Sequence, residues 1–281
     1  MLAVPKRLRY FLQRDTALQG TVLRIFLSVV ERCLRELQHD EDIGFLLDQL
    51  RELGLDRNTI VIYSSGNGVE HSTWPHGGTT PYRGEKMTTW EGGVRVPMLV
   101  RWPGRIPAGT KLNGIQSHED VFTTLASAAG IPDIRQRLSN GDALGTDTIK
   151  KAYIDGLDNL TYWTGKSDES ARNIVFMYEE GKLAAVRMNQ WKACFSTRDG
   201  YYGTSTEMAL PMLVNLRQDP FESYLQAPGP RAELTQHKTY MMNMVLEQLA
   251  QHVATFKSFP PRQPTTTTSV SVIMQRMKAA P

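Results

Sequence analysis

The sequence predicts an α/β fold that is followed by a smaller antiparallel α+β part. Two observations lead to this prediction. An amphipathic helix and a buried strand come early in the chain, and several short strand-like runs follow residue 165. The 281 residues are 41% hydrophobic and 22% charged, so the composition is that of a globular chain with a sizeable core.

Residues 42–53 carry the pattern of an amphipathic helix. Their apolar side chains recur three or four positions apart, which places them on one stripe: Ile43, Leu46, Leu47, Leu50 and Leu53. Gly54 follows at once, and glycine commonly stands just past the end of a helix. We therefore expect the helix to stop there.

The run NTIVIYSS, residues 58–65, is almost unbroken in its apolar and β-branched residues. Such a run predicts a strand that is buried on both faces, as in a parallel sheet. It ends in Gly66-Asn67-Gly68. Ligands of open α/β sheets lie beyond the carboxyl ends of the strands, so Asn67 is a candidate site residue.

The connection between residues 69 and 93 is long, polar and rich in Gly, Thr and Pro, which indicates an active-site loop. Residues 97–104 predict a second buried strand, and residues 119–131 predict a helix that ends at Gly130. Residues 133–165 are polar, and we expect them to be irregular.

The last part of the chain predicts an antiparallel sheet. Short strand-like runs lie close together in NIVFMY, LAAVRM, WKACFS and LVNL. A helix from about Glu233 to Phe256 is expected to pack on them, and the Pro- and Thr-rich tail that follows is expected to be extended. We predict an unassigned segment at 1–38, an α/β domain at 39–165, and a C-terminal subdomain with its tail at 166–281.

Charge and cysteine content exclude several classes of protein. The formal charge of +3 is spread without long Lys/Arg runs, so neither nucleic acid nor a membrane surface is an expected partner. The basic N-terminus shows no clear signal peptide, because Arg24 interrupts its apolar stretch. Cys33 and Cys194 form no disulfide or zinc pattern, and the compartment stays open.

The stretch SSGNGVEHSTWPHGGTTPYRGEKMTTWEGGVRVPMLVRWPG resembles the sulfatase pattern S-D-N-G, a variable loop, and K-x-T-x-x-E-G-G-x-R-V-P. Later segments match the same family in order, among them SHEDVFTTLASAAGIPD, AVRMNQWKACF and LVNLRQDPFES. From about Asp40 to Gln263 the chain is similar to type I, formylglycine-dependent arylsulfatases of the bacterial branch. The resemblance implies the C-terminal part of an alkaline-phosphatase-like sulfatase core, followed by a small subdomain with an antiparallel sheet and a helix.

This resemblance implies roles for particular residues. Lys86 matches the lysine that contacts the sulfate, and Asn67 matches one member of an Asp-Asn pair that binds calcium. Gly66 stands where the family has the aspartate, which removes a carboxylate ligand. His71 and His76 lie on the substrate side and are weaker candidates. The alternatives are a solvated surface lysine for Lys86 and a turn residue for Asn67.

The family nucleophile is a formylglycine made from Cys in a C-x-P/A-x-R motif, and this sequence contains no such motif. Cys194 and Arg198 have the required spacing, but Ser196 replaces the Pro or Ala, and Cys33 is followed by Arg35 at that position. A strand cysteine is the expected role of Cys194. We therefore expect an arylsulfatase-like chain that is incomplete and inactive alone.

Two alternative interpretations remain, together with expectations about the cofactor, the ligands and self-association. A non-catalytic module that binds sulfate or sulfated glycans is the second interpretation, and a phosphate or phosphonate monoester hydrolase is the third. Calcium is the cofactor that the family implies, and sulfate esters or sulfated glycans are the expected ligands. An exposed edge of the sheet predicts self-association.

Overall fold

The computed structural model describes residues 35–71, 78–141, 143–144, 147–148, 151–179, 181–224, 233–234 and 237–260. His76, Cys33, and all but the first two residues of the predicted Pro- and Thr-rich tail lie outside these ranges. No helix among the described residues is long and apolar enough to cross a membrane.

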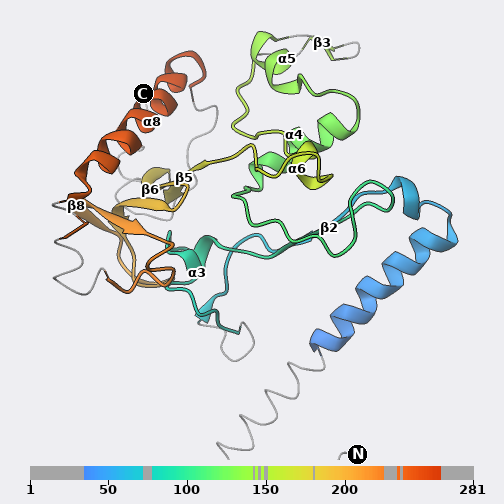
Figure 1. The fold of residues 1–281 in the computed structure, drawn as a ribbon, viewed down its shortest axis with the longest axis horizontal. Coiled ribbons are helices and arrows are strands. Elements are labelled where there is room, and N and C mark those ends of the chain that lie inside the picture. Colours follow the sequence, from blue (N-terminus) through green and yellow to red (C-terminus); the bar gives the residue numbers. More distant parts are fainter. Residues whose placement is uncertain are drawn as a thin grey trace, which may run out of the picture.

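The predicted amphipathic helix is present over residues 35–52. Gly54 adopts a φ of +68°, its N–H donates to the Arg51 carbonyl at 3.0 Å, and the Leu55 N–H donates to the Leu50 carbonyl at 2.9 Å. This pair of bonds is a Schellman motif, so glycine ends the helix as expected. Figure 1 shows the helix standing away from the rest of the fold, and Leu53 is 67% exposed.

After a short 3₁₀ turn η1 (Asp56–Asn58), strand β1 (Val61–Ser64) pairs with β2 (Met98–Arg101). The two strands are antiparallel, and Tyr63 lies opposite Leu99. Both side chains are exposed, at 41% and 66%. The prediction of strands buried on both faces of a parallel sheet is therefore wrong for the described residues, because each strand pairs with the other and turns alternate side chains outward.

Several helices follow β2 in chain order. Helix α4 (Glu119–Ala128) ends before Gly130, which has a φ of +89°, as predicted. The expectation that residues 133–165 are irregular is wrong in part, because they include α5 (Ile134–Asn140), the short hairpin of β3 (Ala143–Leu144) and β4 (Asp147–Thr148), and α6 (Leu160–Trp163). Ile134 and Leu138 of α5 are buried, and their spacing of four residues places them on one helical face.

A buried ion pair joins α4 to the C-terminal part of the chain. The Arg172 guanidinium lies 2.6 Å from an Asp120 carboxylate oxygen, and it donates to both oxygens of that carboxylate. Asp120 also accepts the N–H groups of Ser117 and Leu157. The α/β part and the start of the C-terminal sheet are thus held together by a fully bonded carboxylate.

The predicted antiparallel sheet is present, with the strands in sequence order. Its strands are β5 (Ile174–Glu179), β6 (Lys182–Met188), β7 (Trp191–Thr197) and β8 (Thr206–Asn215). Helix α8 (Thr239–Ser258) lies along this sheet in Figure 1. Its residues Met241 and Val245 pack among buried apolar side chains of the strands. The helix was predicted to pack there. The domain boundaries at 38/39 and 165/166 stay predictions.

Candidate functional site

The turn that follows β1 is held by close contacts between backbones. The Gly68 N–H donates to the Gly93 carbonyl at 2.9 Å, and a Cβ atom on Gly68 would lie 1.8 Å from the Gly92 carbonyl oxygen. No side chain fits in that space. The SSGNG and EGG segments of the sequence pattern therefore pack against each other.

The segment that carries Lys86 is fixed by the same packing. The Lys86 N–H donates to the Val69 carbonyl at 2.8 Å, and the Gly92 N–H donates to the Arg83 carbonyl at 2.7 Å. Helix α3 (Glu91–Val94) closes the segment. Lys86 thus stands next to the carboxyl end of β1.

The Lys86 ammonium group is charged and accessible. Its Nζ atom lies 3.1 Å from a carboxylate oxygen of Glu70, and its side chain is 37% exposed. The hydrogen bond with Glu70 raises the pKa of Lys86. The lysine therefore carries a full positive charge at neutral pH and can meet an anion from solvent.

Glu85 joins Lys86 to a distant part of the chain. Its carboxylate accepts the His71 backbone N–H at 2.5 Å and the Tyr201 backbone N–H at 3.0 Å. The Lys86 Nζ atom lies 5.5 Å from the centroid of the Tyr201 ring. The His71 side chain is exposed, and its Nδ1 atom lies 4.0 Å from the Glu85 carboxylate. The structure thus brings His71, Lys86 and the C-terminal sheet together.

Asn67 lies in an exposed turn. Its Nδ2 group donates to the Gly68 carbonyl at 2.7 Å, and its own carbonyl accepts the Ser65 hydroxyl at 2.8 Å. Gly66 offers no side-chain oxygen. Within the described ranges, no group of three or more His, Cys, Asp or Glu residues could hold a metal ion. These residues by themselves do not fit calcium, which takes about six to eight oxygen ligands.

Behind the Lys86 segment lies a buried charge cluster that we define by Glu91, Lys192 and Glu222. The Lys192 Nζ atom is 2.8 Å from Glu222 and 3.3 Å from Glu91, and none of the three side chains is more than 1% exposed. Burial lowers the pKa of Lys192, but Glu222 and Glu91 outweigh this effect and raise it. Glu222 also accepts the Glu91 N–H at 2.7 Å. The cluster anchors α3 to β7 of the C-terminal sheet.

Cys194 lies beside this cluster and is fully buried. Burial raises the pKa of its thiol to about 11. The thiol is therefore neutral and sheltered, which agrees with a core role on β7 and is unlike an accessible modification site. His118 also has a structural contact, because its Nε2 atom lies 3.2 Å from the Ser64 hydroxyl at the end of β1.

Sequence reasoning missed Glu70, Glu85 and Tyr201. Glu70 and Glu85 lie in the loop that was predicted to serve a site, so their position and charge were available signals. Tyr201 lies more than 100 residues from Lys86 in the chain, and no local pattern links them. Only the packing of the C-terminal hairpin on the loop reveals that contact.

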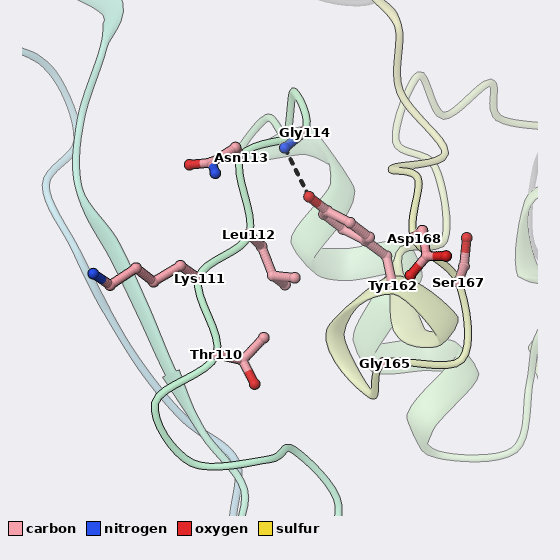
Figure 2. Close-up of a pocket in the computed structure, with 9 residues that line it drawn as sticks. All are labelled: Thr110, Lys111, Leu112, Asn113, Gly114, Tyr162, Gly165, Ser167 and Asp168. Carbon is pink, nitrogen blue, oxygen red and sulfur yellow. Dashed lines mark hydrogen bonds between the residues drawn. The ribbon is translucent and has the colours of Figure 1, made fainter.

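A separate cavity of about 390 Å³ lies between residues 110–114 and 162–168. The Tyr162 hydroxyl accepts the Gly114 N–H at 2.7 Å, as Figure 2 shows. The Lys111 ammonium group points away from Tyr162 in that view. Lys111 and Asp168 are the charged residues that line the cavity, and none of the predicted site residues lines it.

Two family models match the chain. One, described as Sulfatase, matches residues 26–131, and the other, described as the C-terminal region of aryl-sulfatase, matches residues 170–277. The first match begins before Asp40, where the resemblance was expected to start. Together they cover the Lys86 segment and the C-terminal sheet.

Individual relatives agree with these matches. Human steryl-sulfatase is 30% identical over an aligned length of 250 residues, and the alignment covers 79% of this chain and 40% of that protein. N-acetylgalactosamine-6-sulfatase of Canis lupus familiaris is 34% identical over 181 residues, 62% of this chain and 31% of that protein. The chain thus spans less than half the length of these relatives. They are mammalian, so membership of a bacterial branch stays a prediction.

The fold agrees as well. The crystal structure of the PsFucS1 sulfatase from Pseudoalteromonas sp. superposes with a TM-score of 0.65 at 29% identity, over 81% of this chain and 42% of that one. The predicted fold class, part of an alkaline-phosphatase-like sulfatase with an antiparallel C-terminal sheet, is confirmed. With both consecutive regions matched and the fold shared, the chain belongs to the sulfatase family.

Proposed function

We propose that this chain recognises sulfate esters at the end of β1, with Lys86 as the residue that contacts the sulfate. The observation that supports this function is the accessible, charged Lys86 ammonium group, held in place by backbone bonds beside the strand end. A fixed ammonium group stabilises a non-bridging sulfate oxygen through a charge-assisted hydrogen bond. Steryl-sulfatase and N-acetylgalactosamine-6-sulfatase, both relatives, are named for sulfated substrates.

Glu70 competes with a sulfate ester for the Lys86 ammonium group. Its carboxylate now accepts from Lys86 at 3.1 Å, so an arriving anion must share or replace that contact. The exposed ring of His71 is a further donor for the ligand, as is His76, which lies outside the described residues. We keep both histidines as weaker members of the proposed site.

We further propose that the chain binds sulfate esters without hydrolysing them alone. The sequence contains no C-x-P/A-x-R motif, and the buried thiol of Cys194 is not a substitute for it. The described residues do not fit calcium, and the contact between Lys86 and the sulfate does not involve the ion. Turnover of an aryl sulfate by the purified chain, after co-expression with a formylglycine-generating enzyme, would contradict this proposal.

Calorimetry with inorganic sulfate tests the role of Lys86. Losing one hydrogen bond to a charged group corresponds to at least about a tenfold weaker affinity, which is the expected effect of Lys86→Met. Lys182→Met is the matched control, since Lys182 is also ion-paired at 3.1 Å but lies on β6 and is 73% exposed. Equal affinities in the native chain and Lys86→Met would refute the assignment.

A non-catalytic module for sulfated glycans is the second candidate function. Gly66 supports it, because a site that lacks the family's aspartate keeps the anion-binding lysine and loses a metal-binding carboxylate. Titration with a sulfated glycan separates the two: binding much tighter than that of inorganic sulfate supports the module, and absence of glycan binding counts against it.

We also propose that the chain self-associates. Large apolar side chains are exposed on the helix over residues 35–52 and on β2, including Phe45 at 64%, Leu46 at 62% and Leu99 at 66%. Exposed apolar surface of this kind favours association. Light scattering tests it, and a monodisperse monomer would contradict the proposal.

A further inference from the structure

The hairpin between β7 and β8, residues 198–205, lies against the Lys86 segment. The Trp90 indole N–H donates to the Arg198 carbonyl at 2.9 Å, and the Tyr201 N–H donates to the Glu85 carboxylate at 3.0 Å. These bonds fix the hairpin at both its start and its tip. Part of the C-terminal sheet is therefore built into the surface around Lys86.

The hairpin itself is shaped by internal contacts. The Gly203 N–H donates to the Gly200 carbonyl at 3.0 Å, and the Arg198 guanidinium donates to the Gly203 carbonyl at 2.7 Å. Arg198 also pairs with Glu179 at 2.8 Å. A Cβ atom on Gly200 would lie 2.8 Å from the Glu85 carboxylate, so the tip approaches the loop closely. The tip is thus ordered before any ligand arrives.

Two tyrosines form the tip of this hairpin. The Tyr201 ring faces the Lys86 ammonium group at 5.5 Å, and the Tyr202 ring meets Tyr201 edge-to-face with centroids 4.8 Å apart. Tyr202 is 81% exposed, the highest exposure of any large hydrophobic or aromatic side chain among the described residues. An aromatic face is therefore presented to solvent beside the proposed sulfate contact.

We propose that Tyr201 and Tyr202 form a platform for the ring that carries the sulfate, so that the site selects ring-borne sulfate esters over sulfate itself and over alkyl sulfates. This inference rests on the sulfate recognition proposed above. Aromatic rings attract each other at centroid separations of about 4.5–7 Å. The centroid of the Tyr201 ring lies 5.5 Å from the Lys86 ammonium group, so the ring of an ester whose sulfate binds Lys86 would lie beside Tyr201. Tyrosine adds large contact area at little cost in side-chain entropy.

The ring can be an aromatic ring, as in an aryl sulfate, or a sugar ring, which presents an apolar face of C–H groups. Both present a flat surface that stacks on tyrosine. The phenol hydroxyl is not needed for stacking, so Tyr202→Phe should bind as the native chain does. Tyr202→Ala removes the exposed ring and leaves Lys86 and its pairing with Glu70 unchanged.

The experiment is calorimetry of the full chain with inorganic sulfate, ethyl sulfate, 4-nitrophenyl sulfate and glucose 6-sulfate. For Tyr202→Ala we expect about three- to tenfold weaker binding of the ring-bearing esters, with sulfate and ethyl sulfate unchanged. A loss of affinity for the aryl ester, the sugar ester or both shows which kind of ring binds to the platform. Tyr240→Ala is the matched control, because Tyr240 is an exposed tyrosine on α8.

The outcomes separate this inference from the proposed function. If sulfate binds through Lys86 and Tyr202→Ala leaves every ester unchanged, the platform is refuted while the sulfate site stands. If Tyr202→Ala weakens inorganic sulfate equally, the hairpin supports the loop rather than the ring, and the platform is again refuted. If no anion binds the native chain, the proposed function and the platform fail together.

Discussion

Lys192 lies between two buried carboxylates, and replacing it with methionine would remove its charge from both, while Glu91 would keep its pair with Arg187 at 3.0 Å. The Lys192 side chain is 0% exposed, Glu222 is 2.8 Å away and 0% exposed, and Glu91 is 3.3 Å away and 1% exposed. Removing one partner of a buried ion pair costs about 3–5 kcal/mol, because the remaining charge stays buried. At about 2–4 °C per kcal/mol for large domains, the melting temperature should fall by roughly 6–20 °C. Circular dichroism during thermal unfolding at pH 7 measures this change.

Lys182→Met provides the matched control for that experiment. Lys182 and Glu207 are paired at 3.1 Å, but their side chains are 73% and 77% exposed. An exposed pair contributes about 0–1 kcal/mol, so this variant should melt close to the native chain. Adding Glu222→Gln to Lys192→Met removes one buried charge and should recover part of the loss. A Lys192→Met chain as stable as Lys182→Met would refute the role of the buried cluster.

Three further predictions follow from packing and ionisation. Gly68→Ala should destabilise the fold by about 1–3 kcal/mol through its clash with the Gly92 carbonyl, whereas Gly66→Ala, whose Cβ meets nothing within 4 Å, should not; equal melting temperatures would contradict this. In a chain carrying Cys33→Ser, Cys194 should resist a thiol reagent until unfolding, because burial raises its pKa to about 11, and fast native labelling would disprove it. Burial lowers the pKa of His252 in the folded chain, so as the pH falls below about 6.5 the unfolded chain protonates this histidine before the folded chain does, and the folded state loses stability. The loss of stability between pH 7 and 5 should therefore be smaller in His252→Gln, and an identical pH dependence in the two chains would speak against this.

The local patterns of the sequence predicted those helices and strands whose formation depends mainly on residues close to them in the chain. The helix over residues 35–52 ends at Gly54 through a left-handed residue, and the strands of the C-terminal sheet are short and close in sequence. Such features depend on neighbours within a few residues. The presence of these elements could therefore be predicted from the chain alone, although β8 begins at Thr206, well before the predicted run LVNL, and the first helix begins at residue 35 rather than 42.

The features that the sequence did not predict depend on residues far away in the chain. The apolar run of β1 predicted a parallel neighbouring strand, yet β1 pairs antiparallel with β2. A long connection separates the two strands, so no local pattern indicates that they pair. Lys192 stands in a strand where a lysine ordinarily faces solvent, and its burial follows from Glu91, about 100 residues earlier, and Glu222. Lys86 was predicted from its motif, but its neighbour Tyr201 was not.

A crystal of the chain soaked in selenate tests the assignment of Lys86 most directly. Selenate has the shape and charge of sulfate, and its selenium atom can be located by anomalous scattering. We predict a peak whose anion oxygen lies about 3 Å from the Lys86 Nζ atom, beside the carboxylate of Glu70, and no such peak in Lys86→Met. Anomalous peaks elsewhere, with none beside Lys86 in the native chain, would contradict the proposed sulfate site.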